Sequence, residues 1–208
     1  MTPTGKGEEL TLWETGRRIL LKDARFAPVV RAAGPVRWEA REVDPFRYLV
    51  RSIVYQQLAG AAARTIHGRV LEALRGEVTP EKVLRVRDTT LRQAGLSQNK
   101  LAAIRDLAHK VCDGTVALHD LEERTDAEVE ERLVQVRGIG PWTAHMFLLF
   151  HLRRPDVWPV GDLGVRSGYA RIHGLDEAPF QKEMSPLGEP YRPWRSAAAW
   201  YCWRALEV

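Results

Sequence analysis

The chain has 208 residues, 45% of them hydrophobic and 28% charged, with a formal net charge of +4; this excludes a disordered chain and allows one core or two small cooperating lobes. The positive charge is carried mainly by arginine, which favours phosphate binding but would equally follow from an arginine-rich genome. Because no apolar run approaches the roughly 20 residues of a membrane span, and the N-terminus shows no secretory signal, we expect a cytoplasmic protein without membrane association.

Helix signals dominate the chain, and no stretch alternates with the period of two that builds sheets, so we predict an all-α fold. Asp44 and Pro45 predict the N-cap and first position of a helix that continues past Ile53 until residues 59–60 interrupt it. A second helix is expected at about residues 61–74. Several short helices with short connections follow from this pattern.

Further along the chain, Thr79 and Ser97 predict the N-caps of two more helices. Thr125 and Glu128 fit a capping box, in which each residue bonds the backbone N–H of the other. The helix that begins there is expected to carry an apolar face as far as Val136.

The segment 133–144 reads Leu-Val-Gln-Val-Arg-Gly-Ile-Gly-Pro-Trp-Thr-Ala. An apolar helix ends there, a Gly-x-Gly turn reverses the chain, and Pro141 stands where the next helix would begin. We predict a helix-hairpin-helix at about residues 133–152. Gly138 and Gly140 let the backbone approach a phosphate, and the first N–H groups of the second helix point outward with the positive end of its dipole. Such contacts bind DNA without reading its sequence.

Asp162 follows a Pro/Gly loop and precedes another predicted helix, in the segment 157–166, Val-Trp-Pro-Val-Gly-Asp-Leu-Gly-Val-Arg. Its carboxylate would lie near a helix N-terminus, where the dipole favours the ionised form. Two interpretations stay open from the local sequence: a charge used in chemistry, or simply an N-cap. His145 is interpreted as a polar-face residue of its helix rather than as a general acid.

No cofactor is expected from the cysteines and histidines. Cys112 and Cys202 stand alone in helical segments, which fits reduced thiols, and two cysteines cannot hold a four-cysteine iron–sulfur cluster. No Cys/His cluster has metal-ligand spacing, and no glycine-rich nucleotide loop occurs.

Four motifs in order give the chain a family resemblance. The hairpin, the Asp162 loop and the tail 193–201, Pro-Trp-Arg-Ser-Ala-Ala-Ala-Trp-Tyr, together resemble the 3-methyladenine DNA glycosylase II family of the helix-hairpin-helix DNA glycosylase superfamily. Residues 52–59, Ser-Ile-Val-Tyr-Gln-Gln-Leu-Ala, resemble this family's first DNA-facing turn. The similarity runs from about residue 44 to residue 203.

The resemblance implies a helix-hairpin-helix DNA glycosylase fold with two helical lobes and the active-site cleft between them. Residues 1–51 and 151–208 would form the N/C-terminal lobe, and residues 52–150 the central lobe. The implied function is that of a monofunctional DNA glycosylase in base excision repair, a monomer that flips alkylated purines such as 3-methyladenine and 7-methylguanine out of double-stranded DNA and excises them by hydrolysis. Asp162 would be its catalytic carboxylate.

The resemblance also assigns residues to DNA contacts and to a base pocket. The DNA backbone would be held at Gly138, Ile139, Gly140 and Thr143. The wedge that fills the space left by the flipped nucleotide would be Gln56, Gln57 or Leu58. A monovalent cation would bind the backbone carbonyls of Val134, Val136 and Ile139. The base pocket would be formed by Trp142, Trp194, Met146 and Tyr55.

Aromatic walls suit an alkylated purine because such a base is cationic. Core packing is the alternative interpretation for the pocket residues. It is the default for the remaining tryptophans, which are Trp13, Trp38, Trp158, Trp200 and Trp203.

Two other functions stay open. A non-catalytic helix-hairpin-helix module would hold DNA for a partner without releasing bases. A bifunctional glycosylase/lyase would act on oxidised bases, but in that branch, which resembles endonuclease III, a lysine nucleophile follows the hairpin. Trp142 stands at the matching position, so no Schiff base with the sugar can form there.

Overall fold

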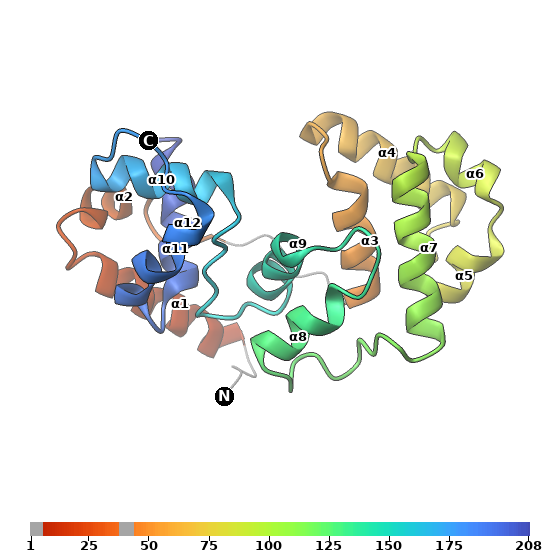
Figure 1. Ribbon diagram of the computed structural model, residues 1–208, viewed down its shortest axis with the longest axis horizontal. Coiled ribbons are helices and arrows are strands. Elements are labelled where there is room, and N and C mark those ends of the chain that lie inside the picture. The colour runs from red at the N-terminus through yellow and green to blue at the C-terminus, as the bar shows by residue number, and fades with distance from the viewer. Residues whose placement is uncertain (1–5, 38–43) are drawn as a thin grey trace. The chain divides into compact units, whose positions relative to one another are not determined.

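A computed structural model describes residues 6–37 and 44–208 of the chain, and every regular element in these ranges is a helix (Figure 1). The predicted all-α class is therefore confirmed. Trp38 lies outside the described residues. In the part of the chain that the structure describes, no helix is both long and apolar enough to span a membrane.

Contacts divide the chain into two units, one made of residues 1–41 and 148–208 and the other of residues 42–147. The lobe boundary expected at residue 51 falls inside α3 (Pro45–Tyr55), a continuous helix that belongs with the second unit. The cleft expected between the lobes stays a prediction.

The unit of residues 42–147 contains seven helices in its described residues. They are α3, α4 (Gly60–Ala73), α5 (Pro80–Arg85), α6 (Asp88–Gln93), α7 (Gln98–Cys112), α8 (Asp126–Leu133) and α9 (Pro141–Met146). The starts of α3, α5 and α7 are set by local capping, because side-chain oxygens of Asp44, Thr79 and Ser97 accept the N–H three residues ahead. The capping box predicted at the start of α8 is present. Helix α7 buries Leu101, Ile104 and Leu107 and packs against α3, α5 and α6.

The unit of residues 1–41 and 148–208 is built around α12 (Arg195–Ala205), whose residues 196–202 are all buried. Around it lie α1 (Lys6–Leu20), α2 (Phe26–Ala33), α10 (Leu163–His173), α11 (Gln181–Gly188) and the short η2 (Glu189–Tyr191). Helices α10 and α12 meet at Gly168, where a Cβ would stand 1.9 Å from the carbonyl oxygen of Cys202. A glycine is therefore needed for the backbones to come so close.

Candidate active site

Asp162 is the N-cap of α10, and only 8% of its surface is exposed. Its Oδ1 accepts two hydrogen bonds, from the backbone N–H of Val165 at 2.8 Å and from the indole N–H of Trp203 at 2.9 Å. Both N–H groups, and the positive end of the dipole of α10, are therefore directed at the nearly buried carboxylate. The two interpretations left open by the sequence are thus compatible, since the capping residue is also a nearly buried, fixed carboxylate.

The loop before Asp162 is fastened to α11 and α12. The hydroxyl of Ser196 accepts the N–H of Val157 at 2.8 Å and donates to the carbonyl oxygen of Arg154 at 2.6 Å. The indole N–H of Trp158 donates to the carbonyl oxygen of Met184 at 2.8 Å. Because each anchor belongs to a helix of the same unit, the position of Asp162 is set by the packed helices rather than by the loop alone.

The predicted hairpin is present between α8 and α9, although the first helix begins at Asp126 and ends at Leu133, before the expected Val136. Gly138 has φ +78°, whereas Gly140 has φ −104° and is the N-cap that precedes Pro141. Only Gly138 therefore needs a backbone conformation that other residues rarely adopt. The second helix is short, because α9 continues from Phe147 as a π-helical turn, η1 (Phe147–His151).

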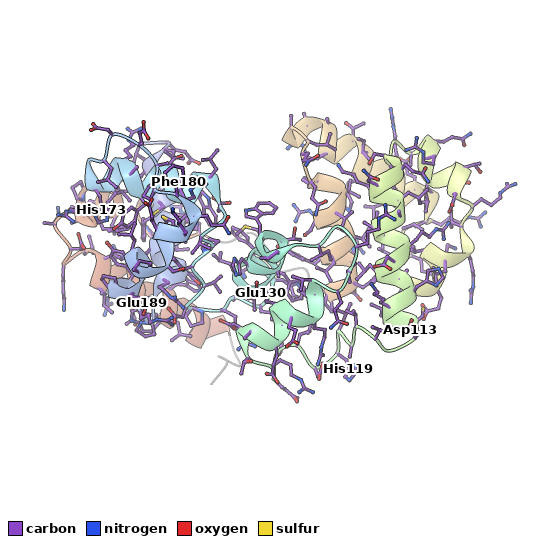
Figure 2. All side chains as sticks on the ribbon, in the orientation of Figure 1. Asp113, His119, Glu130, His173, Phe180 and Glu189 are labelled. Atoms are coloured by element: carbon purple, nitrogen blue, oxygen red, sulfur yellow. The ribbon has the colours of Figure 1, made fainter. Side chains whose placement is uncertain are left out.

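The hairpin is bound to α7 through Asp106, whose Oδ2 accepts the backbone N–H of Arg137 at 2.7 Å and the ammonium of Lys110 at 2.9 Å. Burial opposes ionisation of Asp106, but these two donors hold the pKa of its carboxyl below the usual value. Within the hairpin, His145 lies 3.1 Å from a carboxylate oxygen of Glu130, which projects from α8 (Figure 2). His145 therefore links α8 to α9, in keeping with its interpretation as a polar-face residue.

The turn after α3 is bound to the same hairpin. The side-chain amide of Gln56 donates to the carbonyl oxygen of Gly138 at 2.9 Å and to the hydroxyl of the buried Thr143 at 3.4 Å. The ammonium of Lys100 donates to the carbonyl oxygens of Val54 and Gln56 at 2.8 and 2.7 Å, and burial lowers the pKa of Lys100. The turn and the hairpin thus form one connected body.

The three candidate wedge residues differ in this turn. The side chain of Gln56 is occupied by the hairpin, whereas Gln57 is exposed with φ +55° and Leu58 is 37% exposed. An inserted side chain must be able to leave the protein surface. Gln57 and Leu58 meet this requirement better than Gln56 does.

A cavity of about 480 Å³ adjoins the turn, within the range of small-molecule sites. It is lined by Ser52, Tyr55, Gln56, Gln57, Leu58, Trp142, Thr143 and Met146. Three of the four predicted pocket residues are therefore brought together, with Trp142 45% exposed and Met146 buried. Trp194 belongs to the other unit, at the start of α12, where it lies against Gly16 of α1. Its place in the base pocket stays a prediction.

The predicted cation site lies in the turn of the hairpin. The carbonyl oxygen of Val136 accepts the N–H of Ile139 at 3.0 Å, and Val134 is the C-cap of α8. A carbonyl oxygen has two lone pairs, so this bond is compatible with a cation at Val136. The site stays a prediction.

Trp203 contacts Asp162, although the sequence indicates only core packing for this tryptophan. Trp13, Trp158 and Trp200 are buried as expected, but Trp203 is only half-buried and bonds Asp162. The available signal was Gly164, since a glycine in the first turn of a helix marks a close approach by another group.

The described residues thus combine helices, a hairpin and a capping aspartate, in the order that the resemblance of the motifs implies. Residues 50–193 match the family described as HhH-GPD superfamily base excision DNA repair protein. The chain is also 35% identical over 168 residues to DNA-3-methyladenine glycosylase 1 of Schizosaccharomyces pombe. The aligned region covers 79% of this chain and 74% of the relative. The protein therefore belongs to the HhH-GPD superfamily, as its motifs predicted.

Solved structures agree with this assignment. A 3-methyladenine DNA glycosylase of Schizosaccharomyces pombe in complex with abasic DNA superposes with a TM-score of 0.84 at 31% identity, covering 93% of this chain and 97% of that one. A DNA-3-methyladenine glycosidase of Bacillus halodurans gives a TM-score of 0.80 at 34% identity, covering 99% and 91%. The predicted helix-hairpin-helix glycosylase fold is thereby confirmed.

Proposed function

We propose that the protein is a monofunctional DNA glycosylase that flips an alkylated purine, such as 3-methyladenine or 7-methylguanine, out of duplex DNA and hydrolyses its N-glycosidic bond. The observation that carries this proposal is Asp162, a nearly buried carboxylate fixed by two N–H donors at the start of α10. The similarity to glycosylases named for 3-methyladenine supports the choice of substrate.

Asp162 has the properties that this reaction requires. Glycoside hydrolysis passes through a sugar with oxocarbenium character, which a fixed negative charge stabilises. The carboxylate of Asp162 would also be able to orient the attacking water. Because its donors are the N–H groups of Val165 and Trp203, the carboxylate is held in place before the substrate arrives.

The cavity beside α9 fits the base that leaves. An alkylated purine is cationic while attached to the sugar, and Trp142 and Tyr55 offer aromatic faces worth roughly 0.5 to 2 kcal/mol for a desolvated cation. Met146 adds a polarisable sulfur to the same lining. The base departs neutral, so the reaction does not depend on a general acid, in keeping with the engagement of His145 by Glu130.

Double-stranded DNA would be held by the backbone of the hairpin around Gly138, Ile139 and Gly140. Such contacts to phosphates do not read the base sequence. Gln57 or Leu58 would enter the space left by the flipped nucleotide. The protein would act as a monomer in the cytoplasm, without a cofactor.

Neither alternative function gains support from the site. A non-catalytic hairpin module has no use for the fixed carboxylate of Asp162 or for the cavity at Trp142. A lyase needs an amine nucleophile, and the amine of Lys100 is engaged by two carbonyl oxygens.

The proposal is tested by incubating the protein with duplex DNA treated with dimethyl sulfate and separating the released bases by chromatography. We expect free 3-methyladenine and 7-methylguanine. Single-turnover rates on defined duplexes should be higher for these cationic bases than for hypoxanthine or 8-oxoguanine, because the neutral lesions lack both the good leaving group and the cation–π contact. DNA binding without release of any base would support the non-catalytic module instead.

A further inference from the structure

Trp203, in α12, makes a hydrogen bond to the N-cap residue of α10. Its indole N–H donates to Oδ1 of Asp162 at 2.9 Å, although 41 residues separate the two in sequence. The indole ring also stacks on Phe150, with ring centroids 5.5 Å apart and an interplanar angle of 24°. Trp203 is therefore held on one face by an aromatic ring and at its edge by the carboxylate.

Two glycines of α10 make this contact possible. A Cβ on Gly164 would stand 2.7 Å from Cδ1 and 2.9 Å from Nε1 of Trp203, closer than real Cβ contacts. One turn later, Gly168 lets the backbone of Cys202 approach α10. The face of α10 that carries these glycines therefore meets α12, and the indole reaches the first turn of α10 beside Asp162.

We propose that Trp203 is a positioning residue for Asp162 in base excision, an inference that rests on the proposed function. The indole N–H adds a donor from another helix to the capping bond from Val165, and two donors that reach Oδ1 from different elements restrict how the carboxylate can turn. The indole N–H is only a donor, so Oδ1 of Asp162 is the acceptor in this bond. Trp203 thus holds the charge in the orientation that the developing sugar cation requires.

The test compares Trp203→Phe with Trp200→Phe. Phenylalanine keeps an aromatic ring but lacks the N–H, and Trp200 is a matched control because it is a buried indole on the same helix that packs against Tyr201 and Arg204. In Trp203→Phe we expect the single-turnover rate constant for 7-methylguanine excision to fall about 10- to 100-fold. Affinity for a duplex with a non-cleavable abasic analogue should stay within about twofold of wild type, since the phosphate anchors are untouched. Equal rates in the two variants would overturn the proposal.

Gly164→Ala removes the same bond by another route. Alanine is the better helix former and the glycine has no positive φ, so helix propensity alone would stabilise the variant. Its methyl group must displace the indole, and the rate should fall as in Trp203→Phe. Because both changes act on one bond, the double variant should be no slower than the slower single variant. Full additivity of the two losses would contradict the proposal.

A measurement without activity separates this inference from the proposed function. The indole ¹H–¹⁵N resonance of Trp203, identified by its absence from the Trp203→Phe spectrum, should move upfield in Asp162→Asn because a neutral amide accepts more weakly than a carboxylate. The resonance of Trp200 should stay in place. An unmoved Trp203 resonance would refute the hydrogen bond even in an active enzyme, and a shifted one in a protein that releases no base would refute only the function.

Discussion

The side-chain amide of Gln56 donates to the carbonyl oxygen of Gly138 at 2.9 Å, which joins the turn after α3 to the hairpin. Lys100 bonds the carbonyl oxygens of Val54, in the last turn of α3, and of Gln56, in the turn that follows. A wedge residue in this turn is therefore fixed relative to the hairpin that would bind the phosphate. Flipping and backbone binding would be performed by one rigid body rather than by two independent segments.

This link predicts opposite effects for neighbouring glutamines. Gln57→Gly should not lower the melting temperature, since glycine adopts the φ of +55° without strain, and it should lower the excision rate if Gln57 rather than Leu58 is the wedge. Gln56→Ala should instead cost about 1 kcal/mol of stability through the lost bond to Gly138. Thermal melting and single-turnover excision measured on both variants would test this. A stability loss confined to Gln57→Gly would contradict the structural role assigned to Gln56.

The two hairpin glycines should also behave differently. Gly138→Val should cost about 1 to 2 kcal/mol of stability, because φ is +78° and a Cβ would lie 3.2 Å from the Cβ of Ala103. Gly140→Ala should fold normally, since φ is −104° and no atom lies within 4 Å of its added Cβ. If the DNA backbone approaches here, Gly140→Ala nevertheless weakens binding to damaged and undamaged duplexes equally. Unchanged affinity in Gly140→Ala would place the phosphate contact elsewhere.

The enzyme should leave the abasic strand intact after releasing the base. Trp142 stands where the lyase branch has its lysine nucleophile, so no Schiff base with the sugar is expected. Borohydride treatment during turnover should therefore give no covalent protein–DNA adduct, with a lysine-dependent lyase as the positive control. A trapped adduct would identify another amine, and Lys100→Met would then show whether Lys100 is responsible.

The helix starts were predictable from the sequence because they depend on residues three or four positions apart. Asp44, Thr79 and Ser97 each cap the helix that they were expected to cap. Asp162 was identified for a similar reason, since a capping aspartate after a Pro/Gly loop is a local pattern. The family resemblance then gave this local pattern a function.

The contacts that distinguish the site were not predictable, because they join residues far apart in sequence. Gln56 and Gly138 are 82 residues apart, so the sequence alone does not distinguish Gln56 from Gln57 and Leu58 as candidates for the wedge. The bond from Trp203 to Asp162 depends on the packing of α12 against α10, which no local pattern shows. The unit to which α3 belongs is likewise decided by its contacts and not by a local pattern.

The central claim is that the Asp162 carboxylate performs base excision, and Asp162→Asn tests it most directly. Asparagine has nearly the same size and is an equally good N-cap, so the start of α10 should survive while the charge is lost. We expect single-turnover release of 7-methylguanine to fall at least about 100-fold, whereas affinity for duplex DNA is retained. Excision by Asp162→Asn at a near wild-type rate would contradict this claim.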